Sequence, residues 1–374
     1  MFWFWLVAGP ALALAIFALR GERKRAHFVA ERLVPDPEKP TPPVTIVTSI
    51  EGADRALRDN VSALATQDYP NYELIVAARS AADIPPDVLP SGVTVVLLGT
   101  KKAGDDVRAE NLLAGVQAAR KRSEILAFAD AYGRVSPQWL RALVRPLTEA
   151  NVGVSTGFWW FAPEPPDFWS LLRSVWSAPV AGLLGPGDNP FAWAGSMAVQ
   201  KEIFFELRIP SGWRESIGES GVVSRAVHKA GLRIAFAPGA MAAYSGRISM
   251  LSFLGWARRQ SILARLYLPR PWWEALVAHL FYCGGMAAAI VASIQGSRGA
   301  EWVLVTQLGL GMLKGMNRAT LAKAELAAHE AWFQRHAWVH SLWVPLATWF
   351  WLGILLASAF PFRPTVKKSG SVPA

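Results

Sequence analysis

Val44-Thr45-Ile46-Val47-Thr48-Ser49 is the stretch that decides the fold class. It is short, uncharged and mostly β-branched, which predicts a buried strand. Helical spacing follows over residues 53–66, and further strands are predicted over 72–78, 93–98 and 125–129, with a helix over 108–119. Strands that alternate with helices predict βαβ units, and therefore an α/β fold with a parallel sheet.

Ligands of such sheets bind beyond the carboxyl ends of the strands. Two segments follow predicted strands directly, residues 77–83 and residues 130–133, the second of which begins with Asp130. We therefore expect the functional site at this edge of the sheet.

The composition indicates association with a membrane. The chain has 38 Lys and Arg against 28 Asp and Glu, a net charge of +10, and 52% of its residues are apolar while 18% are charged. Soluble domains have about 25% charged residues, and disordered chains combine low hydrophobicity with high charge. Cys283 is the single cysteine, which excludes an intrachain disulfide and a CxxC zinc site. The basic clusters adjoin apolar segments, so nucleic acid binding is not predicted.

Residues 2–19 form an uncharged run that is followed directly by Arg20, Arg23, Lys24 and Arg25. A secretory signal carries positive charge before its apolar run, so this order predicts a retained anchor. The positive-inside rule then places the following domain in the cytoplasm, at an inner membrane of bacterial type. The run is at the lower limit for a span, and a buried core helix is the alternative.

Apolar stretches at residues 275–295 and 337–360 predict C-terminal spans, and the shorter stretch at 302–313 leaves their number at two or three. Residues 168–176 are aromatic and amphipathic, and either the protein core or the membrane interface accounts for them. The predicted domains are an anchor (1–20), a basic and Pro-rich linker (21–43), an α/β domain (44–270), a transmembrane region (271–360) and a polar basic tail (361–374).

Several motifs of the α/β domain occur in a recognisable order. They are Gln67-Asp68-Tyr69-Pro70, Arg108-Ala109-Glu110-Asn111-Leu112, Asp130, Trp193-Ala194-Gly195-Ser196-Met197 and Trp256-Ala257-Arg258-Arg259-Gln260. In this order, between one N-terminal and several C-terminal apolar stretches, they resemble membrane glycosyltransferases of the family 2 type, in the ceramide glucosyltransferase group. The resemblance covers most of residues 40–275.

The resemblance implies a GT-A fold, a nucleotide-sugar donor such as UDP-glucose, and a lipid acceptor whose hydroxyl group is presented at the cytoplasmic leaflet. It also implies a divalent cation, Mg²⁺ or Mn²⁺, because a metal or an arginine must stabilise the charge that develops on the leaving diphosphate. Direct inverting displacement further needs a carboxylate base for the acceptor hydroxyl.

The first acidic motif of the family is altered in this chain, and the carboxylate of the second is kept. Ser80 stands at the expected aspartate position, and Asp83 is the nearest carboxylate, with an ordinary loop acid as the alternative. Asp130 matches the second motif at a strand end, where a metal or the diphosphate would bind, and a turn cap is its alternative. Tyr132 supplies no second carboxylate, so Asp130 alone predicts a weak cation site.

The third motif is altered at the catalytic base. Glu219 matches its first acid, while Ser220 replaces the base. A serine of ordinary pKa accepts no proton at neutral pH, so Glu219 is the candidate base, provided that it reaches the acceptor. Capping of a helix N-terminus by both residues is the alternative.

The last motif is predicted to bind the donor. Trp256, Arg259 and Gln260 match a Trp-x-x-Arg-Gln form of it. Arg259 would bind the diphosphate, or anionic lipid heads as the alternative. Arg108 and Asn111 have the i, i+3 spacing of one helix face and would reach the nucleotide, unless they are ordinary helix surface.

The motifs and the apolar stretches leave three candidate functions. The first is an active glycosyltransferase that makes a glycolipid. The second is a catalytically weakened homologue that binds a nucleotide-sugar or lipid as a partner protein, because two of three acidic positions are Ser80 and Ser220. The third is a transporter, which is disfavoured because only His279 and His340 interrupt the apolar stretches.

Overall fold

A computed structural model describes residues 2–33, 40–99 and 107–360 of the chain. These residues form two compact units. The sheet unit contains Glu31–Trp159 and Gly185–Ser245, and the helical unit contains Met1–Ala30, Trp160–Leu184 and Gly246–Phe362. The predicted tail and part of the predicted linker lie outside the described residues.

The sheet unit is built on a seven-stranded sheet in the order β3-β2-β1-β4-β7-β5-β8. Its strands are β1 (Val44–Ser49), β2 (Tyr72–Ala78), β3 (Thr94–Leu97), β4 (Ile125–Asp130), β5 (Val152–Thr156), β7 (Ser196–Gln200) and β8 (Arg233–Phe236). The predictions of β1 to β4 and of an α/β fold are confirmed. The four predicted strands pair in parallel, as expected, and β7, which the sequence analysis did not predict, runs antiparallel to both β4 and β5.

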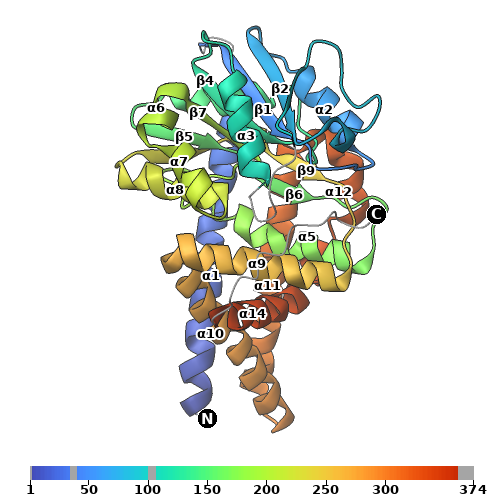
Figure 1. Cartoon of the computed structure of the whole chain (residues 1–374). Coiled ribbons are helices and arrows are strands. Elements are labelled where there is room, and N and C mark those ends of the chain that lie inside the picture. Colours follow the sequence, from blue (N-terminus) through green and yellow to red (C-terminus); the bar gives the residue numbers. More distant parts are fainter. Residues whose placement is uncertain (1, 34–39, 100–106, 361–374) are drawn as a thin grey trace. The chain divides into compact units, whose positions relative to one another are not determined.

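Two apolar layers cover the two faces of this sheet. Ile46 of β1 packs in one buried cluster with Leu57 of α2, whereas the next residue, Val47, packs in the other with Leu112 of α3. Alternate residues of a strand point to opposite faces, so a strand that is covered on both sides is apolar throughout. Figure 1 shows α3 across one face of the sheet. The helices of this unit are α2 (Leu57–Ala65), α3 (Val107–Ala118), α4 (Trp139–Val144), α6 (Lys201–Glu206), α7 (Ile209–Glu215) and α8 (Glu219–Lys229).

Short elements complete the sheet unit and lead out of it. They are three 3-10 turns at Ala81–Asp83, Arg145–Thr148 and Pro238–Ala240, together with β6 (Trp159–Phe161) and β9 (Ala242–Tyr244). The chain enters the helical unit within β6.

Long helices make up the helical unit. They are α1 (Phe2–Arg32), α5 (Phe168–Ala181), α9 (Met250–Tyr267), α10 (Pro269–Ile294), α11 (Arg298–Glu325) and α14 (Val344–Ala359), with the short α12 (Glu330–His336) and α13 (Val339–Leu342). Helix α1 continues through residues 21–32, which the sequence assigned to the linker. The apolar stretch at 337–360 is divided between α13 and α14, and Pro345 lies in the first turn of α14, where its missing N–H breaks no helical hydrogen bond.

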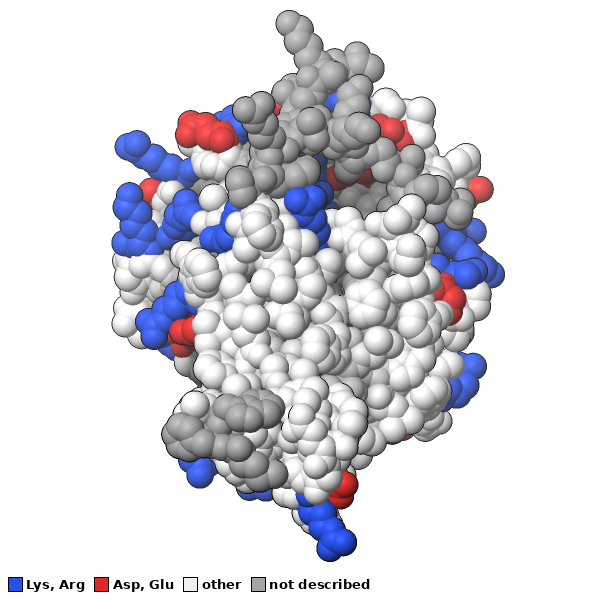
Figure 2. Space-filling model, turned by 90° about the horizontal axis from the view of Figure 1, so that it is seen from below, with Lys and Arg blue, Asp and Glu red and all other residues white. Residues whose placement is uncertain are grey.

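Two of the described helices are long and apolar enough to cross a membrane, by length and composition. They are Phe4–Arg32 and Pro269–Ile294, while Val344–Ala359 is apolar but shorter. Only 22% and 33% of the residues in the apolar windows of the two long helices are buried, so most of these residues are partly or fully exposed. Figure 2 shows a broad face without charge, with Lys and Arg side chains at its margin. By contrast, α5 is buried over nearly its whole length, which favours the core for residues 168–176.

Buried ion pairs join α1 to α11 within the helical unit. Arg25 donates to Glu325 at 2.7 Å, and Arg318 donates to Glu22 at 2.6 Å. The side chains of Arg25 and Glu325 are 5% and 1% exposed. Arg25 is therefore neutralised inside the protein, and Arg20, Arg23 and Lys24 are the exposed cations that flank the apolar part of α1.

Candidate active site

The site is built around the carboxyl end of β4. Asp130 ends this strand beside Ser49, which ends the parallel β1. The Asp130 backbone N–H donates to the carbonyl oxygen of Gly195, so the loop before the antiparallel β7 reaches the same edge. The Asp130 carboxylate accepts the backbone N–H of Tyr132 at 3.0 Å. Oδ1 of Asp130 thus caps a turn, which was the alternative interpretation of this residue, while its Oδ2 faces Arg108.

Arg108 of α3 lies between two carboxylates. Its Nη1 is 3.6 Å from Oδ2 of Asp130, and its Nε is 3.7 Å from Oε1 of Glu219. Burial by itself would lower the pKa of Arg108, but the charges of Asp130, Glu219 and Glu51 outweigh it and raise the pKa well above its ordinary value. Arg108 is therefore a permanent cation at the centre of an acidic group.

Glu219 is the first residue of α8. The preceding Gly218 has φ of 89°, a conformation that favours glycine and turns the chain sharply into the helix. The Trp213 indole donates to the Glu219 carbonyl at 3.2 Å and holds this turn. The backbone at the start of α8 thus directs the Glu219 carboxylate towards Arg108.

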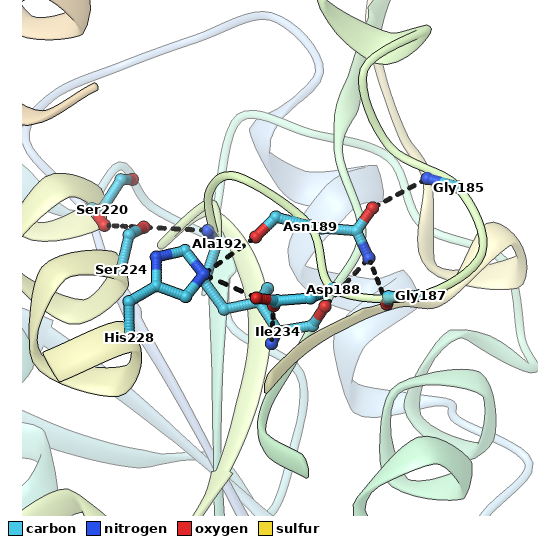
Figure 3. A network of polar contacts seen from close by, with 9 residues as sticks. All are labelled: Gly185, Gly187, Asp188, Asn189, Ala192, Ser220, Ser224, His228 and Ile234. Atoms are coloured by element: carbon cyan, nitrogen blue, oxygen red, sulfur yellow. Dashed lines mark hydrogen bonds and ion pairs between the residues drawn. The ribbon is translucent and has the colours of Figure 1, made fainter. Parts of the chain in front are cut away.

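Ser220 has a different role from Glu219. Its hydroxyl oxygen accepts the backbone N–H of Ala194 at 2.9 Å, and its carbonyl accepts the hydroxyl of Ser224 at 2.6 Å. Ser224 in turn accepts the backbone N–H of Ala192 at 2.9 Å (Figure 3). The two serines hold the loop that leads into β7, next to the residue that bonds Asp130.

The other end of this loop is fixed by a polar network that sequence reasoning missed. Asp188 accepts the backbone N–H of Ile234 at 2.9 Å, and Asn189 donates to the Ile234 carbonyl at 2.9 Å (Figure 3). His228 of α8 lies 3.1 Å from the Asn189 carbonyl. Strand β8 and helix α8 therefore position the loop beside the site, and no local pattern signals such a long-range arrangement.

Two tyrosines and a glutamate complete the site and were also missed. The Tyr132 hydroxyl accepts the backbone N–H of Glu51 at 2.9 Å, and burial raises the Tyr132 pKa to about 12. Burial, together with the charge of Asp130, raises the pKa of Tyr244 well above its ordinary value. A side chain at Gly133 would meet the Tyr244 ring at 2.9 Å, so glycine makes room for this tyrosine. Glu51 lies two residues after the end of β1, so the rule that ligands bind beyond the carboxyl ends of strands would have predicted it as a site residue.

Asn111 is buried inside the sheet unit. Its amide donates to the Ser49 hydroxyl at 2.9 Å, and no part of its side chain is exposed. It thus supports the carboxyl end of β1 directly beneath the site.

Ser80 and Asp83 lie at the end of β2. The Asp83 carboxylate accepts the Ser80 backbone N–H at 2.8 Å and its hydroxyl at 3.1 Å, which forms a local cap. Strand β2 is separated from β4 by β1, a displacement of about 10 Å across the sheet. This arrangement agrees with the loop-acid interpretation of Asp83.

Trp256, Arg259 and Gln260 belong to α9 of the helical unit. The Trp256 ring contacts Phe161 and Trp176, with centroids 5.4 and 5.5 Å apart. Of the predicted site residues, the sheet unit therefore brings Arg108, Asp130 and Glu219 into one cluster.

The donor set suits a divalent cation that is shared with a ligand. Among the described residues, no group of three or more His, Cys, Asp or Glu side chains is arranged to hold a metal. Mg²⁺ is usually held by one or two carboxylates together with substrate phosphates. The charges of Asp130, Glu219 and Glu51 all act on the Arg108 guanidinium. Asp130 with a diphosphate fits such a cation, and the protein side chains alone do not.

Residues 4–178 match the model of glycosyl transferase family 21. The protein is a glycosyltransferase. The matched part of this glycosyltransferase includes Arg108 and Asp130 and ends before Glu219.

The glycosyltransferase is also similar to solved structures. One is a mannosyltransferase from Pyrobaculum calidifontis in complex with GDP-Man and Mn²⁺, with 18% identity over 94% of this chain and 97% of that chain and a TM-score of 0.48. Another is glucosyl-3-phosphoglycerate synthase from Mycobacterium tuberculosis in complex with Mn²⁺, UDP and glucosyl-3-phosphoglycerate. That match has 19% identity over 62% of this chain and 85% of that chain, with a TM-score of 0.41.

Proposed function

We propose that the protein transfers glucose from UDP-glucose to a hydroxyl group of a lipid, with inversion at the anomeric carbon, on a sheet unit of the GT-A type. The observation that carries the proposal is Arg108 between the carboxylates of Asp130 and Glu219, at 3.6 and 3.7 Å. A cation and two acids at the carboxyl ends of the strands are the groups that a nucleotide diphosphate and an acceptor hydroxyl require.

Arg108 donates to the diphosphate oxygens, because a guanidinium forms paired, charge-assisted hydrogen bonds with phosphate. Asp130 would hold a Mg²⁺ or Mn²⁺ ion together with the diphosphate, and such an ion would stabilise the negative charge that develops on the leaving group. Pairing with the diphosphate also weakens the attraction of Arg108 for Glu219, which is then better placed to act as a base.

The Glu219 carboxylate accepts the proton of the acceptor hydroxyl as the hydroxyl oxygen forms a bond to the anomeric carbon. The bond from this carbon to the diphosphate oxygen breaks, and the diphosphate leaves with the electron pair. A positioned base contributes about 10²–10⁴-fold to such a step. Attack opposite to the leaving group inverts the configuration.

Exposed apolar side chains support the membrane part of the proposal. Phe17 on α1 and Ile294 on α10 are 71% and 81% exposed, whereas the core helix of a soluble protein would be mostly buried. By the positive-inside rule, the exposed Arg20, Arg23 and Lys24 support an orientation with the sheet unit in the cytoplasm. A reporter that is fused after residue 35 and works only outside the cytoplasm would contradict this orientation.

A catalytically weakened homologue is the second candidate. Ser220 stands at the position of the expected base, and its hydroxyl already accepts the Ala194 N–H. In that case the site would bind a nucleotide-sugar without transferring it.

Transfer of radiolabelled glucose from UDP-glucose to lipid extracts tests both candidates, with full-length protein in detergent and with or without Mn²⁺. Glu219→Gln should lose at least 100-fold in turnover and keep its UDP affinity, while Glu215→Gln, an exposed acid at the end of α7, should match the parent. Undiminished turnover in Glu219→Gln would refute Glu219 as base. UDP binding without turnover in the parent would favour the weakened homologue.

A further inference from the structure

Arg173 of α5 is a buried cation in the helical unit. It is 9% exposed, and none of the ion pairs among the described residues includes it. Asp167 is the acid whose charge acts on Arg173, but Asp167 accepts a hydrogen bond from Arg247 at 2.7 Å. Burial therefore lowers the pKa of Arg173 to about 10, and Asp167 offsets this only in part. A buried charge without a close counter-charge is strongly unfavourable.

The guanidinium of Arg173 is incompletely bonded. Its Nη2 donates to the carbonyl oxygen of Gly246, while its buried Nε has no hydrogen-bond partner in the structure. The group lies over the Phe161 ring, 4.0 Å from the centroid. The aromatic face offsets part of the desolvation and supplies no acceptor for Nε.

A second donor belongs to the same cluster. Trp176 lies three residues after Arg173 on α5, a spacing that puts both on one helix face. Its indole is buried, and its Nε1 has no hydrogen-bond partner in the structure. The Trp176 ring contacts Trp256 at 5.5 Å, and Trp256 contacts Phe161 at 5.4 Å, so aromatic contacts link the surroundings of both donors.

We propose that this cluster of Phe161, Arg173, Trp176 and Trp256 binds the phosphate group of an anionic lipid. Phosphate oxygens would accept from the guanidinium and the indole N–H and would compensate the buried charge. The aromatic walls and the exposed apolar surfaces of α1 and α10 in the same unit suit an attached hydrocarbon chain. A neutral headgroup would leave Arg173 uncompensated, and a free phosphate would gain nothing from the aromatic rings. The site goes beyond the proposed sugar transfer and is independent of it.

The test is calorimetric titration of the full-length protein in a neutral detergent, without any nucleotide-sugar, so its outcome is separate from that of the transfer assay. The probes are dodecyl phosphate, dodecanol and inorganic phosphate, the last two carrying only one half of the proposed ligand. We expect dodecyl phosphate to bind at least tenfold more tightly than either of the other two. Arg173→Met should weaken dodecyl phosphate at least tenfold, while Arg270→Met, which removes a 90% exposed arginine side chain, should have no effect.

If Arg173 served only to stabilise the fold, Arg173→Met would unfold at a lower temperature than the parent in the absence of ligand. We instead expect Arg173→Met to unfold at the same or a higher temperature than the parent, because Asp167 offsets the burial of this cation only in part. Equal dodecyl phosphate affinity in Arg173→Met and the parent would overturn the proposal, and inorganic phosphate bound as tightly as dodecyl phosphate would overturn its lipid part. If Arg173→Met does not fold, Trp176→Phe decides, because it keeps a ring and removes only the N–H. Unchanged affinity in that variant would overturn the proposal.

Discussion

Arg108→Met removes the guanidinium that lies between Asp130 and Glu219. The two ion pairs span 3.6 and 3.7 Å, and the three side chains are 21%, 17% and 13% exposed. At an effective dielectric constant of about 20, each pair of unit charges about 4 Å apart attracts by about 4 kcal/mol, most of which desolvation cancels. Arg108→Met takes a close counter-charge away from both Asp130 and Glu219, and a loss of about 3 kcal/mol in the free energy of unfolding follows.

Donor affinity should fall in the same variant. A hydrogen bond to a charged group is worth about 1.5–3 kcal/mol, so the dissociation constant of UDP should rise about 10- to 150-fold. Arg108→Lys keeps the charge without the forked geometry and should lie between the parent and Arg108→Met.

The assay is calorimetric titration of UDP into full-length protein, with thermal unfolding measured in parallel. Arg122→Met is the matched control, because Arg122 is exposed and precedes β4 at the opposite edge of the sheet. UDP affinity in Arg108→Met equal to that of the parent and of Arg122→Met would refute the assignment of this cluster to the donor.

Three further variants test how the site is built. Ser220→Ala should lower the free energy of unfolding by about 1–3 kcal/mol, because the Ala194 N–H loses its acceptor, and denaturant titration measures the difference. Gly133→Ala should cost a similar amount, since the new methyl group would lie 2.9 Å from the Tyr244 ring, and an unchanged melting temperature would contradict that close approach. Burial raises the pKa of Tyr132 to about 12, so between pH 10 and 12 the unfolded chain loses a proton that the folded chain retains, and stability falls as pH rises. Tyr132→Phe should show a smaller fall over that range, which unfolding measured at each pH checks.

The strands β1, β2 and β4 and the position of Asp130 could be predicted from the sequence. Each strand is a short apolar run bounded by turn residues, and a strand covered on both faces must be apolar along its length. The place of Asp130 at a strand end follows from the same local pattern. Arg108 was predicted from helical spacing and from the resemblance, and the first turn of α3 places it beside Asp130.

Only the tertiary structure decided which side chains meet. The antiparallel β7 enters between β4 and β5 and brings the loop at Ala194 to the edge that holds Asp130. Glu219 and Ser220 are adjacent in the chain, yet the start of α8 directs one to Arg108 and bonds the other to Ala194. The tertiary structure likewise separates the basic residues of α1 into two groups: Arg25 is buried against Glu325, whereas Arg20, Arg23 and Lys24 are exposed. Local sequence patterns indicate the periodicity and polarity of a segment. The partner of a charged side chain depends instead on which distant segments pack against it, and this packing is determined by the burial of apolar surface throughout the chain.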